Sequence, residues 1–127
     1  MTNMLDVMKI KVERQEHGLM VMSMPVTDEV KQPFGFLHGG ASLALGETAC
    51  SMGAADIIDT DHYIPLGLEM NANHIGSTTK GTIFATATMI HEGSTTQVWN
   101  IDIKDDTDRL ICVMRGTIAI KPRKRNK

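Results

Sequence analysis

The segment that most constrains the fold is residues 38–58, which begins His-Gly-Gly-Ala-Ser and continues with apolar and small residues. Leu45 and Ala49 lie in its middle, and few polar residues interrupt it. A helix that is apolar on nearly every side is usually buried within its domain. Gly46 and Gly53 lower its helix propensity by about 1 kcal/mol each relative to alanine. Close packing against a sheet can offset that cost, because glycine permits a close approach of backbones.

The rest of the chain has the alternating and β-branched character of strands. We expect strands at residues 8–15, 19–25, 66–74, 81–91, 97–104 and 110–120, with a turn at 16–18 that makes the first two a hairpin. The three methionines at 20, 22 and 24 alternate and are predicted to fill the inward face of a strand. One buried helix with an antiparallel sheet around it predicts an α+β domain, here residues 1–120.

Charge and composition narrow the function classes. Five of the thirteen positive residues lie in residues 121–127, whereas all fifteen acidic residues precede them, so we expect a short basic tail. Aromatic residues make up only 4% of the chain, which argues against single-strand nucleic-acid binding. No apolar run is long enough to span a membrane, and no signal peptide is recognised. Cys50 and Cys112 form no CxxC pair and are predicted to be buried thiols of a cytoplasmic protein.

The beginning of the predicted helix carries the most informative chemistry. His38, Gly39 and Gly40 leave backbone amides uncovered at the positive end of the helix dipole, where they can bind an anion or a developing oxyanion. Glu47 is a carboxylate among apolar helix neighbours, and burial there would make it a candidate general base. Ser51 lies one turn further on the same face and can bond Glu47 or a nearby water molecule.

The sequence lacks the motifs of several other catalytic and binding sites. No GxSxG elbow surrounds a serine, and no phosphate-binding GxxxxGK[ST] or dinucleotide-binding GxGxxG segment is present. The five histidines do not have the spacing of metal ligands, so we expect no metal site.

The distance along the helix indicates a site shared by two chains. Gly40 and Glu47 are seven residues apart, or about 10 Å of helix. A reacting carbonyl needs its oxyanion donors and its base within about 3 Å of the chemistry. One helix therefore cannot supply both groups to one substrate, whereas two antiparallel copies about a two-fold axis can.

The same residues carry a family resemblance. Residues 31–42 with Glu47 and Ser51, residues 67–74 and residues 91–99 resemble hotdog-fold acyl-CoA thioesterases. The likeness is greatest to the phenylacetate-pathway type and to the 1,4-dihydroxy-2-naphthoyl-CoA hydrolases of menaquinone biosynthesis. It implies a hotdog fold, in which an antiparallel sheet wraps one long central helix, assembled as a dimer or a dimer of dimers (a homotetramer).

The resemblance also implies roles for individual residues. Glu47 would be the general base or the nucleophile, Gly39 and His38 would act at the thioester carbonyl, Gln32 would orient it, and Ser51 would assist the water. Gly40 belongs to the helix-start site for the substrate. The positions where the family holds coenzyme A are Asn73, His74, His91, Gly93, Ser94 and Thr95. The short N-terminus departs from the family, because it lacks most of the leading helix expected in near relatives.

These observations predict an enzyme that hydrolyses an aromatic or related acyl-CoA thioester to the free acid and CoA. Coenzyme A is then part of the substrate, and no separate cofactor is expected. Two alternatives stay open: an acyl-CoA-binding hotdog protein without activity, and a hotdog hydratase of enoyl thioesters. The hydratase needs an acid and a base at the β-carbon, and the helix supplies one carboxylate at this face.

Overall fold

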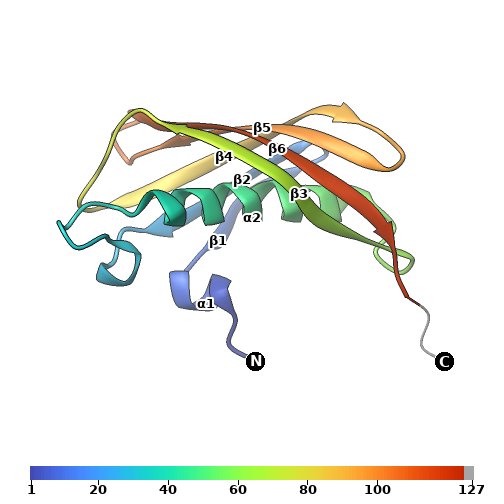
Figure 1. The fold of residues 1–127 in the computed structure, drawn as a ribbon, viewed down its shortest axis with the longest axis horizontal. Helices are drawn as coiled ribbons and strands as arrows, with labels where there is room; N and C mark the ends of the chain where they lie inside the picture. Colours follow the sequence, from blue (N-terminus) through green and yellow to red (C-terminus); the bar gives the residue numbers. More distant parts are fainter. Residues whose placement is uncertain (125–127) are drawn as a thin grey trace.

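The structure is a computed structural model that describes residues 1–124, so Arg125 and Lys127 of the expected basic tail lie outside the described residues. Six strands form one antiparallel sheet in the order β1-β2-β4-β5-β6-β3, and the long helix α2 lies along one face of it (Figure 1). The elements, in chain order, are α1 Met4–Met8, β1 Lys11–Glu16, β2 Leu19–Pro25, the 3-10 turn Asp28–Val30, α2 Gly39–Ile57, β3 Tyr63–His74, β4 Thr82–Glu92, β5 Thr96–Lys104 and β6 Leu110–Pro122. The predicted α+β class, with one central helix and an antiparallel sheet, is confirmed.

The core lies between α2 and the concave face of the sheet. The predicted inward positions of β2 are confirmed, because Met20, Met22 and Met24 are all buried. Trp99 on β5 is also fully buried, and its indole N–H donates a 2.9 Å hydrogen bond to the side-chain oxygen of Gln97. Small residues on α2 let this layer approach closely: a Cβ atom at Gly53 would lie 2.7 Å from the Trp99 ring.

The N-terminal segment differs from the expectation of a strand at residues 8–15. Residues 4–8 form the short helix α1, whose N-cap Asn3 and residue Asp6 exchange side-chain and backbone hydrogen bonds. Lys9 then adopts a left-handed conformation (φ 57°), which ends the helix and redirects the chain into β1. The alternation of apolar residues at 8, 10 and 12 was therefore misleading, because it spans a helix end and an exposed edge strand. Only this short helix precedes the first strand.

Strand β3 forms one edge of the sheet and contains a β-bulge. The register with β6 shifts between Gly67, which pairs with Ile118, and Glu69, which pairs with Thr117. Leu68 is the extra residue at the bulge and is 63% exposed, so it does not face the helix. The bulge allows both Gly67 and Met70 to face the helix.

Strand β6 continues to Pro122, two residues into the expected tail. Beyond it, the backbone N–H of Arg123 donates to the carbonyl of His62 (2.8 Å), and the Arg123 side chain donates to the carbonyl of Thr60. The end of β6 is therefore fixed to the loop that joins α2 to β3.

Burial makes Cys50 chemically inert. Both cysteines are buried free thiols, and burial, with the nearby charge of Glu47, raises the pKa of Cys50 to about 12. Because only the thiolate reacts, we expect native Cys50 at pH 8 to react with an aromatic disulfide reagent about a thousandfold more slowly than an ordinary cysteine. The rate should rise about tenfold per pH unit while the fold persists. Rapid labelling of Cys50 in the native protein, located by peptide mass spectrometry, would contradict this.

Candidate active site

Helix α2 begins at a histidine cap. The side-chain Nδ1 of His38 accepts a hydrogen bond from the backbone N–H of Gly40 at 2.8 Å. The Gly40 amide, expected to be uncovered, is therefore already occupied by the cap. Among residues 1–124, the Gly39 N–H has no acceptor, so it is the free donor at the positive end of the helix. The helix start thus offers one backbone donor rather than two.

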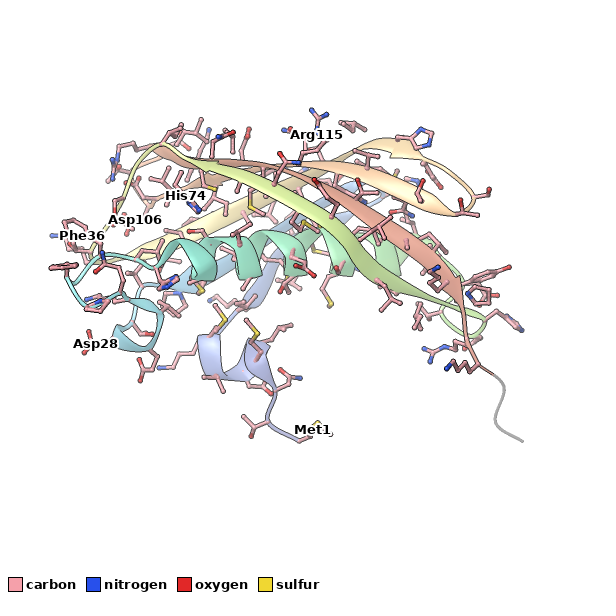
Figure 2. All side chains as sticks on the ribbon, viewed as in Figure 1. Met1, Asp28, Phe36, His74, Asp106 and Arg115 are labelled. Carbon is pink, nitrogen blue, oxygen red and sulfur yellow. The ribbon has the colours of Figure 1, made fainter. Side chains whose placement is uncertain are left out.

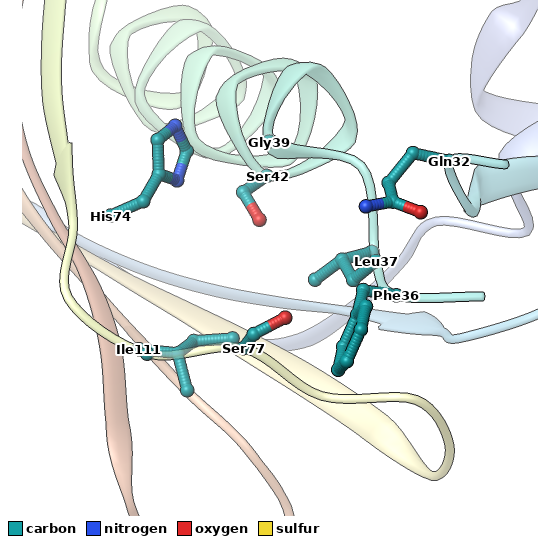
Figure 3. Close-up of a pocket in the computed structure, with 9 residues that line it drawn as sticks. Gln32, Phe36, Leu37, Gly39, Ser42, His74, Ser77 and Ile111 are labelled. Atoms are coloured by element: carbon teal, nitrogen blue, oxygen red, sulfur yellow. The ribbon is translucent and has the colours of Figure 1, made fainter. Parts of the chain in front are cut away.

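A cavity of about 410 Å³ opens beside this donor. Figure 3 shows it between the helix start, the loop before it and the segment that follows β3, and it is lined by Gln32, Phe36, Leu37, Gly39, Ser42, His74, Gly76, Ser77 and Ile111. The imidazole of His74 lies directly against Gly39, since a Cβ atom there would be 3.0 Å from Nε2. With any other residue at this position, the imidazole would have to lie a few tenths of an ångström further from the free amide.

The loop at residues 31–37 places Gln32 at the rim of this cavity. Its backbone N–H bonds the carbonyl of Phe36 at 2.8 Å, and Gly35 makes the tight turn with a φ of 90°. The side-chain oxygen of Gln32 accepts from the N–H of Phe34. That bond turns the side-chain amide nitrogen toward the cavity (Figure 3), where it can donate to a substrate oxygen.

Glu47 and Ser51 lie in a different cavity, of about 340 Å³. Its other lining residues are largely apolar and come from α1 and α2: Met4, Leu5, Ala44, Thr48 and Met52. Glu47 is exposed within this chain, which corrects the expectation that its apolar neighbours would bury it. The reason is that the sheet covers only one side of α2, and Glu47 points from the uncovered side near the β3 edge. The structure brings Glu47 and Ser51 together and keeps them apart from Gln32, Gly39 and His74.

Gly67 makes room for the Glu47 carboxylate. A Cβ atom at Gly67 would lie 2.5 Å from Oε2 of Glu47, well inside contact distance. No role was assigned to this glycine from the sequence. Its position inside a strand was the available signal, because an isolated strand glycine often marks a bulge or a close approach of another group.

The substitution Gly67→Ala should therefore displace the Glu47 side chain without unfolding the protein. The clash falls on the far end of a flexible side chain, so we expect little change in the urea unfolding midpoint and a fall in kcat of about tenfold or more. Thr86→Ala, at an exposed position on β4 that lines neither cavity, is the matched control. Unchanged kcat in a folded Gly67→Ala variant would show that the Glu47 position seen here does not matter for turnover.

The residues predicted to hold coenzyme A fall into separate groups. His74 faces the helix, whereas the adjacent Asn73 faces the opposite side of the sheet and lines an outer hollow with Asn71, Asn100 and Arg115. Arg115 points away from α2 in Figure 2. His91, Gly93, Ser94 and Thr95 lie at the β4–β5 turn, at the other end of the sheet from His74. On β5, Thr96 follows the turn and Ile103 lies level with His74. These two positions are seven residues, or about 24 Å, apart, so one chain does not bring the two groups together.

Sequence reasoning missed several residues that line the two cavities. The hydroxyls of Ser42 and Ser77 point into the helix-start cavity (Figure 3), and Met4 and Leu5 cover the Glu47 cavity. Ser77 follows β3 in a loop, and α1 was not expected, so neither had a periodic signal. Ser42 stood within the recognised segment, but nothing in the pattern separated it from an ordinary first-turn residue.

Within residues 1–124, no three His, Cys, Asp or Glu side chains are grouped so that they could hold a metal ion. In the same residues, no helix has the length and apolar character needed to cross a membrane.

Comparison with known proteins gives a consistent picture. Residues 34–112 match the model of the thioesterase superfamily. The 1,4-dihydroxy-2-naphthoyl-CoA hydrolase of Listeria monocytogenes is 47% identical over 116 residues, covering 91% of this chain and 94% of that protein. The hydrolase of the same name from Escherichia coli is 39% identical, covering 93% and 86%. Two crystal structures of one Staphylococcus aureus protein superpose on this chain with a TM-score of 0.94. That protein is 62% identical, and the match covers 95% of this chain and 100% of that one. The two structures carry the substitutions Glu47→Ala and Gln32→Ala, and the second describes the protein as a thioesterase.

Proposed function

The chain belongs to the thioesterase superfamily and is an acyl-CoA thioesterase, and from this premise we propose that its substrates are aromatic or related acyl-CoA thioesters. The hydrolase names of the Listeria and Escherichia relatives support 1,4-dihydroxy-2-naphthoyl-CoA, and hence a place in menaquinone biosynthesis. The observation that carries the proposal is the mainly apolar cavity beside the Glu47 carboxylate. Its volume of about 340 Å³ leaves space for a flat aromatic acyl group next to a base.

We propose that two chains build each active site. Gly39 and Glu47 are eight residues apart on α2, about 12 Å along the axis, and they line different cavities. An oxyanion donor and a base at that separation cannot reach the same carbon. A two-fold axis between antiparallel α2 helices places the helix start of one chain opposite Glu47 of the other.

The edge strand β3 offers the surface for this pairing. Its outer edge lacks a partner strand within the described residues, and it exposes the apolar side chains of Leu66 and Leu68. The opposite edge, β1, is instead rich in charged residues, which disfavour strand pairing. Within one chain, His74 on β3 lies beside Gly39, and Gly67 on β3 lies beside Glu47. An antiparallel β3 pair centred between Met70 and Asn71 would place His74 of one chain opposite Gly67 of the other. The Gly39 amide of one chain would then lie on the same side of the pair as the Glu47 carboxylate of the other.

In the shared site, the Gly39 N–H and the Gln32 amide would polarise the thioester carbonyl and stabilise the oxyanion. The partner's Glu47 would either take a proton from the attacking water or attack the carbonyl carbon itself, with Ser51 holding the water. His38 contributes as the cap that fixes the helix start. Under single turnover in ¹⁸O-water, label in the Glu47 side chain identifies it as the nucleophile, because water has then attacked the Glu47 carbonyl of a mixed anhydride. Label in the product acid alone is obtained either with a general base or when water attacks the acyl carbonyl of the anhydride.

The two-fold axis also bears on the coenzyme A residues. In one chain, His74 and the β4–β5 turn lie at opposite ends of the sheet, but the partner's turn would lie at the same end as His74. We propose that coenzyme A is held between the chains by Asn73, His74 and Gly40 of one and by His91, Gly93, Ser94 and Thr95 of the other. Asn73 reaches it from the outer face, which suits a dimer of dimers.

We propose further that the enzyme needs no separate cofactor, because water is the co-substrate and coenzyme A leaves as a product. The two buried free thiols suit a reducing compartment, which supports a cytoplasmic location. Sedimentation velocity measures whether the chain is a dimer or a tetramer.

A thiol-release assay over aromatic, short-chain and long-chain acyl-CoAs tests the proposed substrate class. We expect the highest kcat/KM for aryl thioesters, with 1,4-dihydroxy-2-naphthoyl-CoA among the best. Tight CoA binding without thiol release from any substrate would favour the alternative of a binding protein. Hydration of an enoyl-CoA without thiol release would favour the hydratase.

A further inference from the structure

We propose that Arg109, held by Asp105, is a positioning residue that fixes both walls of the helix-start cavity. The inference rests on the proposed function, because it concerns the cavity to which we assign the thioester carbonyl. Neither residue lines that cavity, so Arg109 acts through the segments that it holds.

Asp105 organises the turn between β5 and β6. It is buried although charged, and its Oδ1 accepts bonds from the N–H and hydroxyl of Thr107 (2.9 and 2.7 Å) and from the N–H of Arg109 (3.0 Å). Its Oδ2 accepts from Nε of Arg109 at 3.1 Å. The bonds from Thr107 and Arg109 hold the pKa of Asp105 at about 2, so the carboxylate is charged throughout the working pH range. The Arg109 guanidinium is therefore oriented by a fixed anion.

The other side of the guanidinium reaches the segment after β3. Its Nη2 donates to the carbonyl of Ser77, and Nη1 lies where a Cβ atom at Gly76 would be 3.2 Å away. Gly76 and Ser77 form one wall of the helix-start cavity. Figure 2 places the β5–β6 turn, marked by Asp106, at the same end of the molecule as His74 and Phe36.

The segment after β3 then supports the opposite wall. The carbonyl of Thr78, next to Ser77, accepts a 2.9 Å bond from the N–H of Leu37. Leu37 directly precedes His38, whose own N–H bonds the carbonyl of Val30 at 2.9 Å. A continuous set of bonds thus leads from Asp105 through Arg109 and the Ser77–Thr78 backbone to the loop that sets the Gly39 amide. Displacement of that amide by about 1 Å can reduce turnover by up to a hundredfold.

The test compares Arg109→Gln and Asp105→Asn with Lys104→Gln as a matched control. Lys104 pairs with Asp108 at 3.5 Å in the same turn, so its loss removes one cation without touching Ser77. We expect kcat on an aryl-CoA to fall about tenfold or more in Arg109→Gln and Asp105→Asn, with KM changed less than threefold, because the donor acts mainly in the transition state. The control should stay within about twofold of the parent, and Arg109→Lys should recover part of the loss.

Hydrogen exchange gives a second readout that does not depend on the reaction. In Arg109→Gln, exchange of the Leu37 amide should quicken, whereas in Lys104→Gln it should match the parent. Near-ultraviolet circular dichroism of Trp99 checks that every variant is folded at the assay temperature. Folded Arg109→Gln protein with parental kcat, or with parental Leu37 exchange, overturns the inference. Failure of the parent itself to hydrolyse any acyl-CoA would instead reject the proposed function.

Discussion

Replacing Glu47 by glutamine is expected to lower kcat on an aryl-CoA by about 10²- to 10⁴-fold, with little change in KM or in stability. Glutamine keeps the shape of the side chain but can neither take a proton from water nor form an acyl intermediate. Stability should change little because Glu47 is exposed and its carboxylate makes no ion pair among residues 1–124. Initial-rate measurements at saturating substrate, with urea unfolding alongside, separate the two effects.

Asp56→Asn is the matched control for this substitution. Asp56 is also an exposed carboxylate on α2, but it bonds the side chain of Gln15 and lies outside the Glu47 cavity. Its kcat should stay within about twofold of the parent, since it is remote from the proposed chemistry. Parental turnover in Glu47→Gln would remove Glu47 from the mechanism altogether.

Mixing two impaired variants tests whether the site is shared between chains. Glu47→Gln and Gln32→Ala damage opposite halves of the proposed site, so each mixed dimer contains one site without either substitution. Random exchange of subunits at equal concentrations should restore about a quarter of the parental activity. Glu47→Gln and Ser51→Ala damage the same half of the site, so every site in their mixed dimers still carries one substitution. The activity of this mixture should therefore not exceed the contribution of the sites that carry Ser51→Ala. No recovery in the first mixture, with mixed dimers confirmed by native mass spectrometry, would place the whole site within one chain.

The helix and five of the six strands could be predicted because their patterns reflect burial. The apolar surface of residues 39–57 requires a buried helix, and the alternation of Trp99, Ile101 and Ile103 requires a strand with one inward face. The first strand was placed too early, because local capping by Asn3 and Lys9 outweighs a weak alternation on a chain segment that is exposed in any case.

The candidate site could be predicted only as far as residue type and spacing along one helix. The seven-residue spacing of Gly40 and Glu47 was enough to predict that the helix start and Glu47 lie apart, because helix rise is a local property, and the two line different cavities. It could not show that His38 occupies the Gly40 amide, which depends on a side-chain rotamer. Nor could it show that the turn holding Asp105 supports the loop before His38, because that support runs through backbone bonds between segments far apart in the chain.

Gly53→Ala presents a conflict between two effects whose magnitudes decide the outcome. Alanine improves helix propensity by about 1 kcal/mol, which alone would stabilise α2. The added methyl would lie 2.7 Å from the Trp99 ring, however, and that ring is fully buried and held by its bond to Gln97. Overpacking against a side chain that cannot move costs about 1–3 kcal/mol, which outweighs the gain in propensity, so we expect a net loss of about 1 kcal/mol in the free energy of unfolding.

Gly46→Ala tests whether the rigidity of the contacted side chain, rather than the short distance alone, sets the loss of stability. Its nearest atom is the thioether sulfur of Met114, on a flexible side chain that can rotate away, so its loss of stability should be smaller than that of Gly53→Ala. Urea unfolding followed by Trp99 fluorescence, at one fixed chain concentration because association adds to stability, gives both values. If Gly53→Ala were as stable as the parent or more so, the close contact between α2 and β5 would not be the constraint that selects glycine, and helix propensity would have outweighed packing.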